Sequence, residues 1–308
     1  MGHLQLWIDE PGASLDLVSG AARIRLASGE MRQVGVGALA QVTLLRPATL
    51  STDLLRACHE NGVAVALLSE RSPNAAFLWP ASPRGARLRH AQHRVADDAA
   101  HNLDLARWLV AEKIREQMRW LTAQDVEHHL ERFRLAALAT SQIDTLRGIE
   151  GASSARYFRL WAGLWQAPWQ FPGRDRLPPG DPVNALLSLT YTLALAMTGR
   201  LAGARGLDLA VGSLHPLTGD RPALAMDLME PLRPWCDQWV WQICESGKVT
   251  PQDFELDPER GCRLTRDGRR KYYAAWFADQ RRWFEPQARR GLAGWLRQLR
   301  VRPEGLPD

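Results

Sequence analysis

Four side chains in the second half of the chain are of the types that hold a hard divalent metal ion. Glu150 lies in Arg147-Gly148-Ile149-Glu150-Gly151, His215 precedes a proline, and Asp227 lies three residues before Glu230. Carboxylate oxygens together with one imidazole suit Mg²⁺ or Mn²⁺ acting on a phosphodiester, and the glycines beside the first acid leave room for a large substrate. These residues therefore indicate metal-dependent chemistry on a nucleic acid.

Glu150 and His215 each have a structural explanation as well. A glycine in a helix interior costs about 1 kcal/mol relative to alanine, so Gly148 and Gly151 indicate close approach of another backbone or of a ligand. If tight helix packing is the reason, Glu150 lies on a solvated face and has no chemical role. His215 is expected at a loop tip after a strand-like run at 207–211, and a lone histidine there is either a hydrogen-bonded structural residue or a ligand.

Asp227 and Glu230 are expected on one face of a helix that begins near Pro222. Two carboxylates at this spacing repel each other unless a cation lies between them. That cation is either a metal ion or a salt-bridge partner, for which Arg221 and Arg233 are the candidates. The pair alone leaves both explanations open.

The composition is that of an ordinary globular protein with one basic end. The 308 residues are 45% hydrophobic and 24% charged, which excludes a disordered or fibrous chain. The net charge is +5, and the last fifty residues carry 13 Lys/Arg against 6 Asp/Glu. A basic end on a near-neutral body indicates a polyanionic partner, although a solvated basic helix is the commoner cause of such a run.

Other motifs exclude several classes of function. The chain has no phosphate-binding G-x-x-x-x-G-K-[ST] loop and no G-x-S-x-G nucleophile elbow. His90-x-x-His93 and Glu127-His128-His129 resemble metal-ligand spacings, but nothing accompanies them and both are interpreted as surface residues. The tryptophan pairs Trp161/Trp165 and Trp235/Trp239 are interpreted as core or interface packing rather than base stacking.

The chain is predicted to be a cytoplasmic protein without a membrane span. Its four cysteines fit neither a zinc module nor a disulfide framework and are interpreted as reduced thiols. The N-terminus has no signal-like apolar segment. The longest apolar stretch, Val183 to Met197, is too short and too polar to cross a bilayer and is predicted to be a buried helix.

The predicted fold is α+β, with a small β-sheet domain followed by a larger all-α catalytic domain. Residues 1–80 contain short alternating runs, such as Leu4-Gln5-Leu6-Trp7-Ile8, punctuated by Gly and Pro. Within them, one short helix is predicted from Ser51 to Asn61, followed by a fully apolar strand at 63–68. Residues 81–90 form the predicted linker, and residues 91–308 the helical domain.

The helical domain begins with an apolar stripe at helical spacing from Leu103 to Leu121. Further helices are predicted at residues 123–140, 142–165, 181–199 and 222–246, with more from residue 265 onward. A loop rich in Pro and Gly, residues 168–182, separates two of these helices.

The whole chain resembles the CRISPR-associated adaptation integrases, the nuclease-like subunits that insert new spacers into a CRISPR array. The resemblance rests on the order and spacing of several segments: Asn61-Gly62-Val63-Ala64-Val65-Ala66-Leu67-Leu68, Gln92, Ala106-Arg107 with Lys113-Ile114, Gln117 and Leu121, Gly148-Ile149-Glu150-Gly151 with Tyr157-Phe158, Asp181-Pro182-Val183-Asn184-Ala185-Leu186-Leu187, Gly212-x-x-His215, and Asp227-Leu228-Met229-Glu230-x-x-Arg233-Pro234.

This resemblance implies a Mg²⁺ or Mn²⁺ ion held by Glu150, His215 and Glu230, with Asp227 beside them; the division of roles between the last two acids stays open. It also implies a homodimer formed through the β domain, and a smaller CRISPR-associated partner that bridges dimers. The 3′-OH of a prespacer strand in double-stranded DNA would attack the CRISPR repeat by transesterification.

Contacts to the DNA backbone are expected from Arg84, Arg87 and Arg89 near the linker, from Arg233, and from the basic C-terminal segment.

Three alternatives are consistent with the same residues. A stand-alone metal-dependent nuclease of branched DNA would be fully active without a partner subunit. A mobile-element integrase of the same fold usually carries extra DNA-binding domains, for which 308 residues leave little room. A non-catalytic DNA-binding scaffold would keep every DNA-dependent activity when Glu150 or His215 is changed to Ala.

Overall fold

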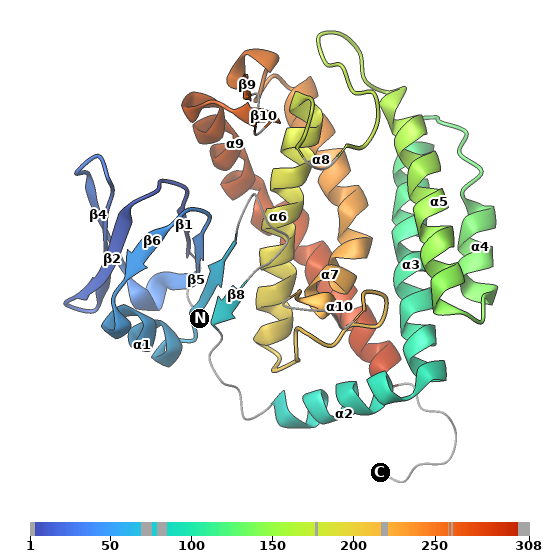
Figure 1. The fold of residues 1–308 in the computed structure, drawn as a ribbon, viewed down its shortest axis with the longest axis horizontal. Coiled ribbons are helices and arrows are strands. Elements are labelled where there is room, and N and C mark those ends of the chain that lie inside the picture. Colours follow the sequence, from blue (N-terminus) through green and yellow to red (C-terminus); the bar gives the residue numbers. More distant parts are fainter. Residues whose placement is uncertain are drawn as a thin grey trace. The chain divides into compact units, whose positions relative to one another are not determined.

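The computed structural model describes residues 4–68, 76–78, 85–175, 178–216, 221–257, 259 and 261–300 (Figure 1). The chain divides into two compact units. One contains residues 1–93, 199–212 and 216–225, and the other contains residues 94–198, 213–215 and 226–308. The N-terminal region is built of β-sheets and the rest is mainly helical, as the sequence predicts.

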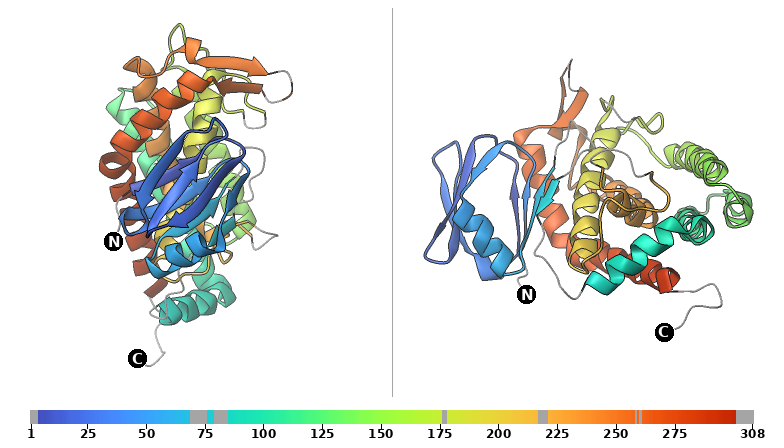
Figure 2. Two further views of the ribbon diagram at one scale, coloured as in Figure 1. Left: turned by 90° about the vertical axis from the view of Figure 1, so that its left-hand side faces the viewer. Right: turned by 60° about the horizontal axis from the view of Figure 1, so that its bottom comes forward.

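Two four-stranded sheets surround one apolar core in the first unit (Figure 2). One sheet has the order β1 (Leu4–Ile8), β5 (Leu39–Leu44), β7 (Ala64–Leu67) and β8 (Ala76–Leu78); the other has β4 (Met31–Gly35), β3 (Ala21–Arg25), β2 (Ala13–Val18) and β6 (Ala48–Leu50). In the first sheet β1, β5 and β7 are parallel, and Val42 is in register with both Leu6 and Val65. Alternate side chains of both sheets therefore meet in the core.

The helix α1 (Thr52–Glu60) has the ends that the sequence predicts. The Ser51 hydroxyl accepts a hydrogen bond from the backbone N–H of Leu54 at 3.2 Å, so Ser51 is the N-cap. Gly62 follows the helix with φ +70°, a conformation that side chains with a Cβ rarely adopt. The chain then enters β7 directly.

The helical elements are long and their order follows the sequence pattern. They are α2 (Ala86–Asp97), α3 (Ala99–Ala123), α4 (Glu131–Ala139), α5 (Ile143–Ala162), α6 (Pro182–Gly203), α7 (Ala223–Met229), the 3₁₀ turn η3 (Glu230–Leu232), α8 (Arg233–Glu245), α9 (Arg266–Asp279), the π-helical turn Gln280–Phe284 and α10 (Glu285–Arg300). The helices α3, α4 and α5 pack side by side. A polar cavity is lined by residues of α3, α5, α6, η3 and α8.

Two predicted helices are shorter than the sequence pattern indicates. The helix predicted at 123–140 begins only at Glu131, because Asp125 and His129 adopt positive φ angles of 55° and 54° that no α-helix contains. The helix predicted at 222–246 is interrupted by η3, where Pro231 and Pro234 lack the backbone N–H that a continuous helix would use.

Two elements were not predicted. The linker assigned to 81–90 is helical from Ala86 onward, in α2. A hairpin of β9 (Phe254–Asp257) and β10 (Gly261–Leu264) precedes α9.

The strand-like run at 207–211 is not a strand. The Gln92 amide donates to the carbonyls of Asp208 and Val211 at 2.8 Å, and it accepts from the Asp208 N–H at 2.9 Å. One glutamine side chain thus satisfies backbone groups that a neighbouring strand would otherwise pair.

One described helix, α6, is long and apolar enough to cross a bilayer by composition. However, 67% of its most apolar window is buried inside the protein, and Val183, Leu186 and Leu187 are fully buried. The helix is therefore a core helix, as the sequence predicts.

All four cysteines are free and buried, with no disulfide among them: Cys58, Cys236, Cys244 and Cys262. Burial raises the pKa of Cys58 and of Cys262 to about 11, which keeps both thiols protonated at neutral pH.

The tryptophans belong mainly to packed aromatic clusters. Trp161 is fully buried and meets the edges of Trp165 and Phe171 at centroid distances of 5.0 and 4.9 Å. Trp239 is also buried and packs on Trp276 at 5.6 Å. Trp161, Trp165 and Trp239 are buried in the packed interior, as predicted, and Trp235 is half-buried and packs on Trp283.

Candidate active site

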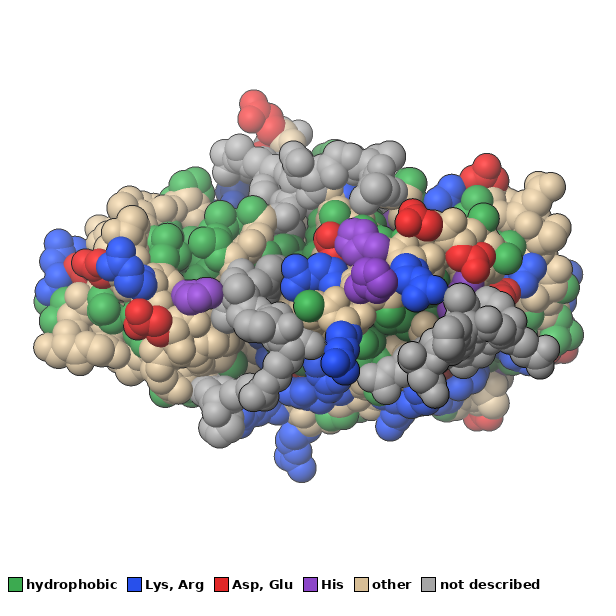
Figure 3. Space-filling model, turned by 90° about the horizontal axis from the view of Figure 1, so that it is seen from below, with side chains coloured by type: hydrophobic (Ala, Val, Ile, Leu, Met, Phe, Trp, Pro, Cys, Tyr) green, Lys and Arg blue, Asp and Glu red, His purple; other side chains and the backbone are tan. Residues whose placement is uncertain are grey.

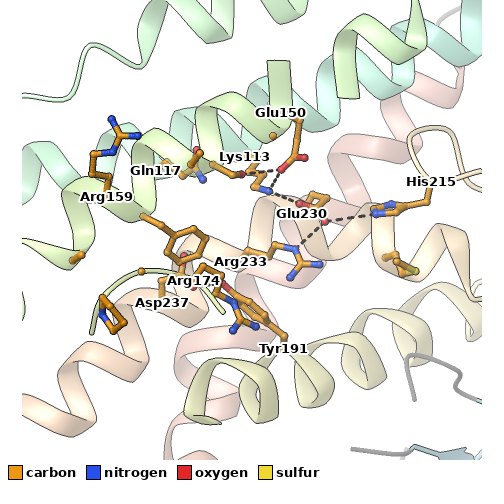
Figure 4. Close-up of a pocket in the computed structure, with 18 residues that line it drawn as sticks. Lys113, Gln117, Glu150, Arg159, Arg174, Tyr191, His215, Glu230, Arg233 and Asp237 are labelled. Atoms are coloured by element: carbon orange, nitrogen blue, oxygen red, sulfur yellow. Dashed lines mark hydrogen bonds and ion pairs between the residues drawn. The ribbon is translucent and has the colours of Figure 1, made fainter. Parts of the chain in front are cut away.

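A cavity of about 590 Å³ lies in the helical unit and is walled by α3, α5, α6, η3 and α8 (Figure 4). Its lining is mixed in charge: Lys113, Gln117, Glu150, Gly151, Ser154, Ala155, Phe158, Arg159, Ala162, Pro172, Gly173, Arg174, Tyr191, His215, Met226, Glu230, Arg233 and Asp237. Three of the four acidic and imidazole residues singled out from the sequence thus border one cavity, although they are up to eighty residues apart in the chain.

The centre of the site is a buried ammonium between two carboxylates. Lys113 donates to Glu150 and, at 2.7 Å, to Oε2 of Glu230. The second oxygen of Glu230 accepts from Nε of Arg233 at 2.8 Å. Lys113 and Glu230 are 5% and 4% exposed, so these ion pairs operate in a medium that screens charge weakly.

Opposing effects set the protonation of this cluster. Burial by itself would raise the pKa of Glu230, but the positive charges of Arg233 and Lys113 outweigh it and hold the pKa well below its usual range. For Lys113, burial would lower the pKa, yet Glu230 and Glu150 raise it overall. Both groups are therefore charged at neutral pH.

Asp227 has a different position from Glu230. It is fully buried behind the loop that carries His215, and it accepts hydrogen bonds from the backbone N–H groups of Ser213, Leu214 and His215. It also lies 2.7 Å from Nδ1 of His215. Since a carboxylate only accepts, Nδ1 carries a proton, and Nε2 is the nitrogen that lies toward Glu230 in the cavity.

The sequence left the roles of the two acids open, and the geometry separates them. Glu230 borders the cavity, whereas Asp227 holds the loop and the imidazole in place. Of the proposed salt-bridge partners, Arg233 does pair with Glu230. Both carboxylates lie beside the same imidazole, Asp227 at Nδ1 from α7 and Glu230 at 4.0 Å from Nε2 from η3.

The donor set fits a hard divalent cation. Nε2 of His215 lies 4.0 Å from Oε1 of Glu230. Mg²⁺ ligands lie at about 2.0–2.1 Å, so two donors on one ion are at most about 4.2 Å apart. Among the residues that the structure describes, no three His, Cys, Asp or Glu side chains chelate an ion as they stand. Lys113 occupies the space between two of the donors.

One interpretation of the sequence placed Glu150 on a solvated face, and the structure places it at the cavity instead. Its Oε1 accepts from Lys113 and, at 2.8 Å, from the hydroxyl of Ser154 one helical turn later. Tight helix packing does not explain Gly148 and Gly151 either, because a Cβ built on either one meets nothing within 4 Å. Gly151 borders the cavity, so its missing side chain leaves room for a ligand.

These two glycines give a matched pair of variants. Gly148→Ala and Gly151→Ala are each expected to raise the free energy of unfolding by about 1 kcal/mol, because alanine favours the helix and neither Cβ meets an obstacle. Of the two, only Gly151→Ala is expected to lower the rate of the DNA joining that the sequence analysis predicts, since Gly151 lines the cavity and Gly148 does not. Urea unfolding and a DNA-joining assay on both variants test this; equal rates for the two would show that the substrate does not pass Gly151.

The arginines predicted to contact DNA fall in different surroundings. Arg87 and Arg89 are exposed on α2, and Arg89 also donates to the carbonyl of Gly206 at 2.9 Å. Arg84 lies outside the described residues. Arg233 is part of the buried ion-pair cluster. The face seen from below, over α2, carries Lys, Arg and His side chains (Figure 3).

The two weaker histidine motifs are surface features, as predicted. His93 is exposed and pairs with Asp208 at 3.3 Å. His129 is exposed and pairs with Glu127 at 3.0 Å.

Sequence reasoning did not identify several residues of the cavity. Lys113 and Gln117 occupy the apolar stripe of α3 one turn apart, and polar residues at such positions were the available signal. Asp237 accepts a hydrogen bond from the hydroxyl of Tyr191, and burial raises the pKa of this carboxyl to about 6. The ring of Tyr191 in turn lies 4.6 Å from the guanidinium of Arg233.

Residues 6–278 match the family model described as CRISPR associated protein Cas1. The chain belongs to the Cas1 family. It is 32% identical to CRISPR-associated endonuclease Cas1 3 of Thermus thermophilus over 88% of this chain and 83% of that protein. It is 35% identical to CRISPR-associated endonuclease Cas1 1 of the same organism, over 87% and 84%. The resemblance to the CRISPR adaptation integrases is thereby confirmed.

Solved structures of Cas1 proteins share the fold. The structure of TM1797, a Cas1 protein from Thermotoga maritima, superposes with a TM-score of 0.82 at 18% identity, covering 96% of this chain and 97% of the other. A casposase bound to integration product gives the same TM-score at 20% identity, covering 96% and 90%. The predicted α+β architecture of the Cas1 family is confirmed, and the relatives named endonucleases identify the chain as an enzyme of the nuclease type.

Proposed function

We propose that this Cas1-family chain is a divalent-metal-dependent DNA integrase and endonuclease of CRISPR adaptation. It joins the 3′-OH ends of a prespacer to the CRISPR repeat by transesterification. The observation that carries the proposal is the convergence of Glu150, His215 and Glu230 on one cavity, at a place that already holds a buried cation.

Each of these residues has a part in the proposed reaction. Glu150, Glu230 and Nε2 of His215 would hold Mg²⁺ or Mn²⁺, which when bound would stabilise charge on the attacking and leaving oxygens. Asp227 fixes the tautomer and direction of the imidazole, so that Nε2 faces the ion's place. Arg233 neutralises Glu230 through Oε1, and Lys113 contacts the other oxygen, Oε2. ATP is not required, because one phosphodiester replaces another.

The rest of the cavity suits a nucleic-acid strand. Arg159 and Arg174 add positive charge along its wall, and the half-buried Phe158 adds an aromatic ring. Phosphates bind guanidinium groups and bases stack on aromatic rings, so both parts of a nucleotide have partners in this cavity. Affinity for double-stranded DNA should fall steeply with salt if arginines supply these contacts.

Partners are proposed from similar proteins. A structure described as a Cas6-RT-Cas1–Cas2 complex resembles this chain with a TM-score of 0.82 at 19% identity, covering 98% of this chain and 36% of that one. This supports a small Cas2-like partner for this chain. The homodimer formed through the β domain is proposed from the resemblance alone. The proposed joining reaction, which acts on the CRISPR array in the genome, takes place in the cytoplasm.

The test is strand transfer of a prespacer with free 3′-OH ends into a supercoiled plasmid that carries a repeat. Joining is expected with Mn²⁺ or Mg²⁺, to be lost with a chelator, and to increase with the small partner. Joining that persists with chelator would contradict the metal-dependent mechanism. Cleavage without joining, even with the partner present, would favour the stand-alone nuclease of branched DNA, and binding without either reaction would favour the scaffold.

A further inference from the structure

The carboxylates proposed as metal ligands are already neutralised by a cation of the chain itself. Lys113 contacts Glu150 and Oε2 of Glu230, and Arg233 holds the other oxygen of Glu230. Both oxygens of Glu230 are therefore engaged. Of the two cations, only Lys113 also contacts Glu150, so only Lys113 lies between two of the proposed ligands.

A divalent ion and this ammonium cannot occupy one place together. Both are cations, they would use the same two carboxylates, and their repulsion in a buried site is weakly screened. The ion can keep Arg233 in place, because a carboxylate oxygen has two lone pairs, so Oε1 of Glu230 can accept from Arg233 and still face an ion beside His215. The ion cannot join Glu150 to Glu230 while the ammonium of Lys113 lies between these carboxylates.

A second position for the ammonium lies one helical turn away. Gln117 is 1% exposed and borders the same cavity, and its Oε1 has no hydrogen-bond partner among the residues that the structure describes. Residues four apart on a helix are neighbours, so the long side chain of Lys113 can reach this carbonyl. Figure 4 shows Gln117 on the side of Lys113 away from His215.

We propose that Lys113 is a built-in competitor for the divalent metal, with one position between Glu150 and Glu230 and a second at the carbonyl of Gln117. This inference rests on the proposed metal-dependent function. Without metal, the ammonium keeps the buried carboxylates neutralised, so the site holds its shape. When metal binds, Lys113 moves to Gln117, and the cost of that exchange lowers the affinity of the site for the ion.

The experiment is calorimetric titration of the full chain with Mn²⁺ alone, without DNA. Lys113→Met is expected to bind Mn²⁺ at least tenfold more tightly than wild type, because the competing cation is gone. Gln117→Leu is expected to bind it several-fold more weakly, because the displaced ammonium loses its acceptor. In the Lys113→Met background, Gln117→Leu should have no further effect.

A matched control is Lys271→Met, which removes a lysine paired with Asp253 at 2.7 Å in the same unit but outside the cavity. Its Mn²⁺ affinity should equal that of wild type. Equal or weaker binding by Lys113→Met, with Gln117→Leu unchanged, would overturn the proposal. If Lys113→Met does not fold, Lys113→Gln replaces it, and Gln117→Leu tests the second position by itself.

Failure of the proposed function gives a different result. Glu230→Gln and His215→Ala should abolish the binding event that Lys113→Met strengthens. If wild type and Lys113→Met both bind no Mn²⁺, the metal-dependent function falls and the inference falls with it. If wild type and Lys113→Met bind Mn²⁺ with the same affinity, and Glu230→Gln abolishes that binding, the metal site stands and the competition by Lys113 is refuted.

Discussion

Glu230→Gln is expected to lower strand transfer by about a thousandfold or more, since the carboxylate would be both an ion ligand and the countercharge of two buried cations. The amide has nearly the same shape, so the loss would come from charge and not from a cavity. Leaving Lys113 and Arg233 without their partner should also cost about 3 kcal/mol of stability. Activity is therefore to be measured well below the unfolding temperature of the variant.

Asp227→Asn provides the graded comparison. Asp227 acts through His215, and loss of a residue that orients a ligand costs about 10- to 100-fold in metal affinity or activity. Glu230→Gln is therefore expected to lower the rate of strand transfer more than Asp227→Asn does. Glu131→Gln, in a partly exposed ion pair with Arg134 outside the cavity, should leave strand transfer unchanged. A larger loss from Asp227→Asn than from Glu230→Gln would mean that Asp227 is the ligand and Glu230 the positioning acid.

Trp161→Ala should have the largest effect on stability, a loss of about 3–5 kcal/mol, because truncating a fully buried aromatic residue removes its contacts and leaves a cavity. The ring of Trp161 meets the edges of Phe158 and Phe171. Phe158 borders the cavity, and Phe171 comes directly before the segment that supplies Pro172, Gly173 and Arg174. Activity is therefore also expected to fall.

Urea unfolding followed by far-ultraviolet circular dichroism measures this loss. Trp235→Ala is the matched comparison, since Trp235 is half-buried and packs on Trp283 and under Arg119. It should cost less than Trp161→Ala. A Trp161→Ala variant no less stable than Trp235→Ala would show that the aromatic cluster can close around the space.

Much of the fold was predictable because local and global signals agree. The Ser51 cap, the apolar run at 63–68 and the helical spacing of the stripe of α3 are local signals that agree with the elements they form. The failure at residues 207–211 has a non-local cause. There the backbone partner is Gln92, more than a hundred residues away, and no local pattern records such a partner.

The site was predictable in its acids and its histidine, but not in its cation. Glu150, His215 and Glu230 have types and neighbours that indicate chemistry, so a sequence pattern finds them. Lys113 matters because the fold brings α3 against α5 and η3. The different contacts of Asp227 and Glu230 likewise depend on where the loop at 213–215 packs, which spacing alone does not determine.

The four buried thiols can be used to measure how readily the surrounding structure opens. A thiol reagent reaches a cysteine only when the surrounding structure opens, so the rate of modification measures the free energy of that opening. Cys58 lies in the β-sheet unit, and Cys236, Cys244 and Cys262 lie in the helical unit. Thiol trapping with mass spectrometry can therefore follow the two units separately, in the unaltered chain and without an introduced label.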